Sequence, residues 1–170
     1  MTKEGYDTDH LIGLLKRFRE KYGLKVILEP GSAFAWQTGD LHTTVLDVVE
    51  NGGKKTAIFD GSFTCHMPDC LEMPYRPEIV NASEKPRADW IPYRLGGVSC
   101  LAGDFLDEYW FASPIQQGDR LIFKDMIHYT MVKTTVFNGV KHPSIGILRA
   151  DGRFDLIKSF DYADFKGRLS

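Results

Sequence analysis

The stretch YRLGGVSCLAGD, residues 93–104, stops a strand-like run at two glycines and places a cysteine three residues after the second glycine. Glycine adopts backbone angles that other residues avoid, so we expect Cys100 on a tight loop rather than inside a helix or strand. A thiol on a loop beside a carboxylate, here Asp104, is suited to act as a nucleophile or a proton donor. A free cysteine is more commonly buried as a small apolar side chain, and the spacing alone favours that alternative.

Around this loop, short strand-like runs alternate with turn residues. Runs over residues 41–49 and 54–60 flank Asn51-Gly52-Gly53, which is a strong hairpin signal. Residues 61–90 are irregular and rich in proline, which fits either a poorly ordered linker or a long functional loop, and their large apolar side chains favour packing. Further elements are predicted as strands over 93–95, 109–112 and 120–124, a hairpin over 144–149 and 154–158, and a short helix over 161–168.

The N-terminal part has a different character. Apolar side chains fall on one face over residues 7–22 and predict a helix, which Asp7 or Thr8 caps and Gly23 ends. Residues 25–28 then predict a short strand. A helix, a tight turn and a strand are half of an α/β repeat, and one strand cannot form a parallel sheet by itself.

The pattern as a whole predicts an α+β chain in two parts. Residues 1–40 are expected to be a helix–strand remnant of an α/β unit, and residues 41–170 a C-terminal, mainly-β domain of barrel or sandwich type.

Composition narrows the class of protein. The 170 residues are 43% hydrophobic, which is ordinary for a globular domain, and the net charge of −2 gives no electrostatic case for nucleic acid. No apolar run approaches the length of a membrane span, so no membrane partner is predicted. An odd number of cysteines, three, does not suggest a disulfide framework. The default expectation is a cytoplasmic location.

Several long and unusual sequence motifs resemble those of a known family. Gly96-Gly97-Val98-Ser99-Cys100 resembles the cysteine loop of the fold-type III pyridoxal-phosphate decarboxylases, the group of ornithine, diaminopimelate and arginine decarboxylases. With three further words the chain is most similar to the carboxynorspermidine decarboxylases. These words are HMPD at 66–69, EMPYRP at 72–77 and DMIHYTMVKTT at 125–135. The resemblance covers essentially all of this chain but only the C-terminal part of that family's chains, and it makes residues 1–40 a helix–strand remnant of a (β/α)8 barrel.

The resemblance implies pyridoxal 5′-phosphate as cofactor and assigns residues to it. Glu29, before Pro30 and Gly31, is expected to pair with the pyridine nitrogen and keep the ring a good electron sink; from the residues alone, a turn is the safer interpretation. Main-chain amides at Gly31 and the hydroxyl of Tyr129 are expected to contact the phosphate. Ser32 stands where ornithine and diaminopimelate relatives usually have arginine. Without the resemblance, Tyr129 is a half-buried aromatic residue of a sheet.

The same resemblance makes residues 65–72 the loop that sets substrate specificity. Asp69 and Glu72 are then candidates to bind amine groups of a polyamine-like substrate, with Asp69 favoured, although both acids fit equally well as solvated loop residues. Arg76 is a candidate for a substrate carboxylate, or pairs with a nearby acid. Phe137 resembles a residue that lines the substrate site, and Asn138 after it fits a turn.

The loop also raises a metal hypothesis, because Cys65, His66 and Cys70 are soft ligands close in sequence. Structural zinc sites usually have a second ligand pair at matching spacing. The sequence contains no such pair, so we predict no metal site.

For Cys100 the resemblance implies the proton donor that reprotonates the α-carbon after decarboxylation. The family delivers this cysteine to the active site of the partner subunit, so a homodimer with shared active sites is expected. Ornithine-type enzymes have aspartate directly after the cysteine, whereas this chain has Leu101. That difference favours carboxynorspermidine or carboxyspermidine over ornithine as substrate.

No lysine here stands in the context of the family's Schiff-base lysine. We therefore expect a truncated chain, inactive alone, of a decarboxylase in norspermidine or spermidine biosynthesis. The alternative is a non-catalytic, stand-alone β-rich interaction module derived from such an enzyme. The presence of Glu29, Asp69, Cys100 and Tyr129 favours the decarboxylase, because a binding module needs neither a pyridinium partner nor a proton donor.

Overall fold

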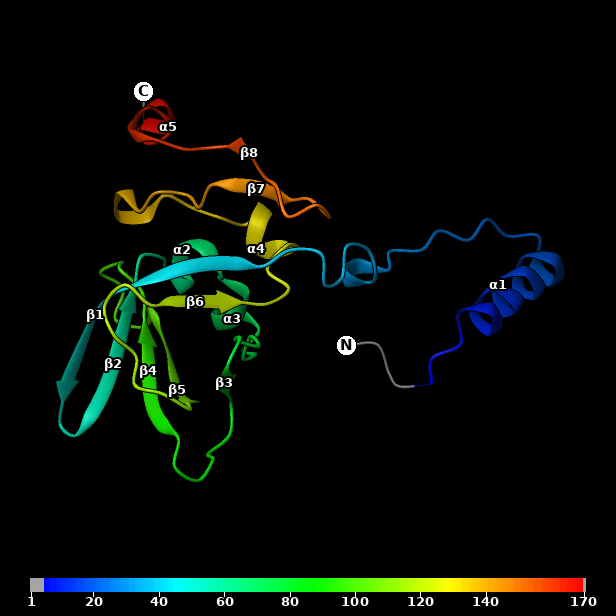
Figure 1. The fold of residues 1–170 in the computed structure, drawn as a ribbon. Helices are drawn as coiled ribbons and strands as arrows, with labels where there is room; N and C mark the ends of the chain where they lie inside the picture. Colours follow the sequence, from blue (N-terminus) through cyan, green and yellow to red (C-terminus); the bar gives the residue numbers. More distant parts are fainter. Residues whose placement is uncertain (1–4, 170) are drawn as a thin grey trace. The chain divides into compact units, whose positions relative to one another are not determined.

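The computed structural model describes residues 5–169 (Figure 1). The chain divides into two compact units, the first ending at Trp36 and the second beginning at Gln37, and each is described by itself. The division predicted after residue 40 lies near this point. It remains a prediction, as does the barrel origin of the first part.

In the first unit, α1 (Thr8–Tyr22) forms as the apolar pattern predicts. Its N-cap is Asp7, whose carboxylate accepts a hydrogen bond from the His10 amide at 3.0 Å. Its C-cap is Gly23, which is left-handed at φ 63° and donates its N–H to the Arg19 carbonyl at 2.8 Å. Every residue of α1 is at least partly exposed.

The strand predicted over residues 25–28 is wrong. This segment takes part in none of the strand pairs found within residues 5–169. A strand is stable only as part of a hydrogen-bonded ladder, so strand-like residues without a paired neighbour stay irregular. A short 3₁₀ turn, η1 (Gly31–Ala33), follows.

The second unit is built on a curled, mixed sheet of six strands in the order β3-β5-β4-β2-β1-β6 (Figure 1). All neighbours are antiparallel except β2 and β4, which are parallel. The strands are β1 (Leu41–Asn51), β2 (Lys54–Phe59), β3 (Ala82–Ser83), β4 (Ile91–Gly96), β5 (Phe105–Phe111) and β6 (Arg120–Phe123). This is the α+β, mainly-β domain that the sequence predicts.

The first hairpin confirms its sequence signal. Asn51 pairs with Lys54, and both intervening glycines, Gly52 and Gly53, have positive φ (57° and 76°). Two central residues with positive φ give the turn whose twist matches that of paired strands.

Residues 60–90 make the crossover between the parallel strands β2 and β4. Such a connection requires a dozen or more residues. The segment is more ordered than its prolines suggest, since it forms α2 (Phe63–His66), α3 (Asp69–Glu72) and β3. The prediction of an irregular segment is therefore wrong at these three places.

The remaining elements lie beyond β6. They are α4 (Tyr129–Val132), the turn η2 (Phe137–Gly139), the hairpin of β7 (Ile145–Leu148) and β8 (Phe154–Lys158), and α5 (Tyr162–Leu169). The C-terminal hairpin and helix are confirmed. Tyr129 begins a one-turn helix, so its alternative interpretation as a sheet aromatic is wrong.

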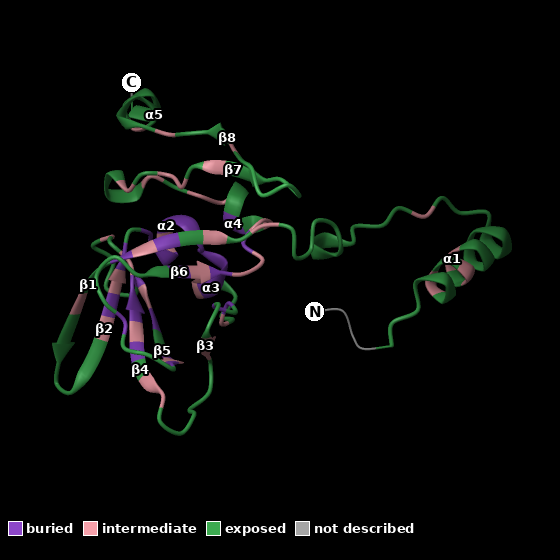
Figure 2. Cartoon of the chain, viewed as in Figure 1, coloured by how far each residue is buried: buried purple, intermediate pink, exposed green. Residues whose placement is uncertain are grey.

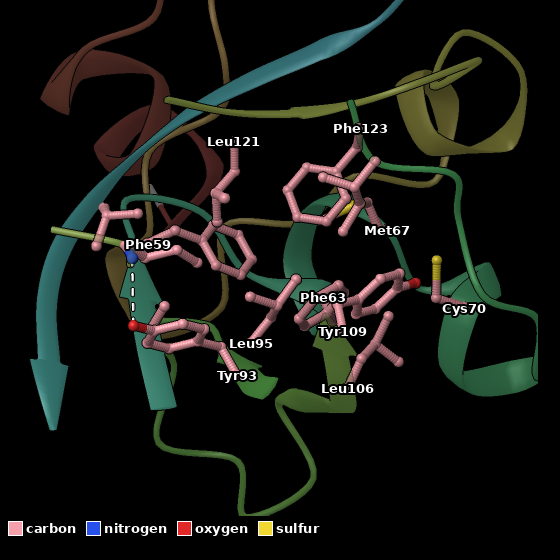
Figure 3. Close-up of a cluster of buried hydrophobic side chains, with 14 of the residues drawn as sticks. Phe59, Phe63, Met67, Cys70, Tyr93, Leu95, Leu106, Tyr109, Leu121 and Phe123 are labelled. Atoms are coloured by element: carbon pink, nitrogen blue, oxygen red, sulfur yellow. Dashed lines mark hydrogen bonds between the residues drawn. The ribbon is translucent and has the colours of Figure 1, made fainter. Parts of the chain in front are cut away.

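Buried side chains gather on the six-stranded sheet and on α2 and α3 (Figure 2). Phe59, Phe63 and Phe123 form a triangle of rings with centroids 5.2 to 5.9 Å apart (Figure 3). Buried Tyr109 satisfies its hydroxyl by donating to the Pro77 carbonyl at 2.9 Å. This core fixes the crossover segment against the sheet. Among residues 5–169, no helix has the length and apolar character needed to cross a membrane.

Candidate active site

Ser62 is the N-cap of helix α2: it has extended backbone angles, and its hydroxyl accepts a hydrogen bond from the Cys65 amide at 3.0 Å. The same hydroxyl donates to Oδ2 of Asp104 at 2.9 Å. The start of α2 is therefore tied to the far end of the loop that carries Cys100.

The side chain of Asp104 accepts the hydrogen bonds that hold this loop in place. It is buried (4% exposed) and also accepts hydrogen bonds from the amides of Thr64 at 3.1 Å and Ser99 at 3.0 Å. A buried carboxylate that accepts several hydrogen bonds is stabilised in place rather than available to solvent. Asp104 thus has a structural function at the cysteine loop.

Cys100 lies on the loop between β4 and β5, as predicted, and is exposed, whereas Cys65 and Cys70 are buried. Its amide donates to Oδ1 of Asn138 at 2.9 Å. Burial raises the pKa of the Cys70 thiol to about 11. Cys100 is therefore the cysteine of this chain whose thiol is open to chemistry.

Asp69 and Glu72, on α3, share one partner that the sequence analysis missed. The Lys133 ammonium lies 2.8 Å from Oδ1 of Asp69 and is also hydrogen-bonded to Glu72. Asp69 is buried (5% exposed), and Glu72 is largely exposed. Hydrogen bonds to Asp69 and then to Glu72 raise the pKa of Lys133, which stays charged.

Lys133 also lies beside Tyr129. It is the C-cap of α4, and its amide donates to the Tyr129 carbonyl at 2.8 Å. Its ammonium is 5.8 Å from the centroid of the Tyr129 ring. Three predicted site residues therefore surround one lysine. The signal that points to it is its spacing, because a lysine four residues after Tyr129 faces that residue on a helical turn.

Arg76 points to the main chain of β5. Its Nη2 donates to the carbonyls of Asp107 and Glu108, and its guanidinium lies 4.2 Å from the ring centroid of Tyr109. Its predicted contact with a substrate carboxylate stays a prediction. Phe137 is 45% exposed, and its carbonyl accepts from the Cys65 thiol at 3.6 Å.

Glu29 and Gly31 lie in the first unit and are exposed. Gly31 has φ 56°, a left-handed angle that favours glycine, and it opens η1. Tyr129, in the second unit, is 56% exposed. These groups fit pyridoxal 5′-phosphate in kind, since a carboxylate accepts the N–H of a pyridinium, and turn amides and a phenol donate to a phosphate.

Fold and site together define a class of protein. Residues 6–127 match the pyridoxal-dependent decarboxylases, C-terminal sheet domain, and the chain belongs to this family. It is 56% identical over 99% of its length to the carboxyaminopropylagmatine decarboxylase of Synechocystis, and 43% identical over 99% to the carboxynorspermidine/carboxyspermidine decarboxylase of Campylobacter jejuni. The expected resemblance to the carboxynorspermidine decarboxylases is confirmed.

A solved structure agrees in fold. The crystal structure of carboxynorspermidine decarboxylase from Campylobacter jejuni, complexed with norspermidine, gives a TM-score of 0.89 at 42% identity and covers 98% of this chain. That alignment covers 48% of the solved chain, and the two curated relatives are covered to 44% and 46%. The chain thus spans slightly less than half the length of these relatives.

Proposed function

We propose that this chain is the C-terminal part of a pyridoxal-phosphate-dependent decarboxylase that acts on a carboxylated polyamine. The observation that carries the proposal is the ammonium of Lys133 held by Asp69 and Glu72 beside Tyr129. It supports the proposal because the α3 carboxylates hold an alkylammonium group here, and a polyamine presents the same kind of group.

Each residue then has a defined task. The cofactor, when bound, supplies the electron sink for loss of carbon dioxide. Glu29 holds the proton at the pyridine nitrogen, and the Gly31 turn and Tyr129 hold the phosphate. The Cys100 thiol holds the proton that the α-carbon receives after carbon dioxide leaves.

Charge counting supports one cationic group of the substrate at α3. Asp69 and Glu72 contribute two negative charges and Lys133 one positive charge, which leaves a net charge of −1. Because Glu72 is the exposed acid, it is the one that an incoming ammonium reaches. Leu101 stands where ornithine enzymes have an acid, so a substrate longer than ornithine fits this loop better.

We further propose that the active protein is a homodimer with shared sites and that this chain alone is inactive. Its relatives are about twice as long, and the lysine that carries the cofactor belongs to the barrel in this family. The preferred substrate is carboxynorspermidine or carboxyspermidine.

A second candidate substrate is carboxyaminopropylagmatine. The relative that carries this name is 56% identical to the chain. The distal group of carboxyaminopropylagmatine is a guanidinium. A guanidinium is planar and can form two hydrogen bonds to one carboxylate, so it also suits Glu72.

The test is an assay of carbon dioxide release by the chain completed with the N-terminal part that its relatives have. The substrates are the three carboxylated polyamines, ornithine, lysine and diaminopimelate, compared by kcat/KM. We expect one of the three polyamines to rank first. A first rank for ornithine contradicts the substrate class, and no turnover of any compound supports the interaction module instead.

A further inference from the structure

One hydrogen bond joins the cysteine loop to a segment 38 residues later. The amide of Cys100 donates to Oδ1 of Asn138 at 2.9 Å. Asn138 lies at the centre of η2, directly after Phe137, and fits a turn by sequence. The proposed function gives Asn138 no task.

The backbone of Asn138 is left-handed, with φ 59° and ψ 12°. Residues other than glycine seldom adopt this conformation, although asparagine tolerates it better than most. Such a conformation persists where the surroundings require it, and it is a reason to look for a functional role.

The turn that contains Asn138 is anchored to α2 at two points. The Thr135 amide donates to the Cys65 carbonyl at 2.9 Å, and the Cys65 thiol donates to the Phe137 carbonyl at 3.6 Å. Cys65 is buried in the core, so the turn is fixed to a rigid element.

These contacts close a ring. Helix α2 connects Cys65 to the N-cap residue Ser62. The Ser62 hydroxyl donates a hydrogen bond to Asp104, which also accepts one from the Ser99 amide. Ser99 and Cys100 are neighbours, and their amides are held by different partners, Asp104 and Asn138. Two consecutive amides held in this way restrain the peptide plane that ends at the Cys100 Cα, and with it the point from which the Cys100 side chain extends.

We propose that Asn138 is a positioning residue for Cys100: its side-chain carbonyl sets the main-chain orientation from which the thiol delivers its proton. The inference rests on the proposed function of Cys100. Proton delivery to one carbon requires tight placement of the donor, and small displacements are costly. Asn138 acts through the main chain and does not contact the reacting atoms.

Two variants separate the hydrogen bond from the backbone conformation. Glycine in Asn138→Gly can adopt the left-handed backbone conformation but has no side-chain hydrogen-bond acceptor. Aspartate in Asn138→Asp tolerates the same conformation and keeps a side-chain oxygen as acceptor. In the 170-residue chain, hydrogen exchange of the Cys100 amide should be about tenfold faster in Asn138→Gly and should return toward the original rate in Asn138→Asp. The Ser99 amide, held by Asp104, is the internal control and should change little.

The functional readout is the product ratio in the chain completed with its N-terminal part. Protonation of the α-carbon gives the amine. Where the thiol does not deliver its proton to the α-carbon, water would release the product as an aldehyde and the amino group would stay with the cofactor. Asn138→Gly should raise the aldehyde fraction with little change in KM, Asn138→Asp should lower it again, and Cys100→Ala should give the largest fraction.

The outcomes are distinct. Unchanged exchange of the Cys100 amide in Asn138→Gly contradicts the hydrogen bond and overturns the inference. Faster exchange with an unchanged product ratio, while Cys100→Ala still raises the aldehyde fraction, overturns the positioning role alone. A Cys100→Ala enzyme with a normal product ratio overturns the proposed function of Cys100, and the inference with it.

Discussion

The carboxylate of Asp104 packs directly against the α-carbon of Gly97. A Cβ added at Gly97 would lie 2.6 Å from Cγ and from Oδ1 of Asp104, closer than a Cβ approaches such atoms in proteins. Gly97 is not among the residues with positive φ. Glycine is therefore required here for space, and not for the backbone freedom that the sequence suggests.

Replacing Gly97 with alanine should displace Asp104 and weaken its hydrogen bonds to Ser62, Thr64 and Ser99. We expect the free energy of unfolding to fall by about 1–3 kcal/mol, the usual cost of overpacking and of disturbing buried hydrogen bonds. Chemical denaturation measures it. Gly103→Ala is the matched control, because a Cβ there meets nothing within 4 Å and Gly103 is not among the residues with positive φ. Equal losses in both variants contradict the explanation.

Replacing Lys133 with methionine should leave Asp69 buried without its ion-pair partner. A buried acid that loses its partner destabilises the folded state, so we expect a clear decrease in Tm. Lys124→Met is the control, since Lys124 pairs with the exposed Glu78 at 2.7 Å and surface pairs contribute little. The Tm of the two variants is measured by thermal unfolding at pH 7. A larger decrease in Tm for Lys124→Met than for Lys133→Met would contradict the importance of Asp69.

Stability should fall in acid because of His66. Burial, and then the nearby His142, lower the pKa of His66 to about 4 from 6.5, while Asp104 and Asp60 oppose this shift. The unfolded chain therefore binds a proton between pH 6.5 and 4 that the folded chain does not. Stability decreases as pH falls through this window, by on the order of 3 kcal/mol.

The check on this prediction is denaturation at several pH values with two variants. His66→Leu should show a flatter pH dependence than the unmodified chain, and His42→Gln, at an exposed position of β1, should follow the unmodified chain. Parallel curves for the unmodified chain and His66→Leu would assign the acid sensitivity to other groups.

Glu29→Gln keeps the size of the side chain and removes its charge. In the completed enzyme, the pyridine nitrogen should lose its proton near neutral pH and the ring should become a poorer electron sink. We expect kcat to fall by about 10²-fold or more, with a changed cofactor absorption spectrum. Glu50→Gln, at an exposed end of β1, is the control. Normal kcat and an unchanged spectrum in Glu29→Gln would leave Glu29 as a turn residue.

Local signals in the sequence predict local structure well. The Asp7 and Gly23 caps of α1 and the Asn51-Gly52-Gly53 hairpin are confirmed, because each depends on residues a few positions apart. The strand over 25–28 is wrong because β propensity does not supply a partner strand.

Contacts between distant segments leave no such signal. The bond between Lys133 and Asp69 joins residues 64 apart, and that between Cys100 and Asn138 joins residues 38 apart. Neither has a periodicity that reveals it. The parallel pairing of β2 with β4 is hidden in the same way, because its cause lies in how the crossover packs.

The parallel contact between β2 and β4 also has a kinetic consequence. β4 reaches β2 only after residues 60–90, with α2 and α3, have closed into a loop, and this closure costs chain entropy before any sheet contact compensates for it. β1 and β2 are joined by two residues and pair with no such delay. We therefore expect the first hairpin to form early and β4 to join late. The segment that carries the proposed substrate contacts, Asp69 and Glu72, would then also set the pace at which the sheet assembles.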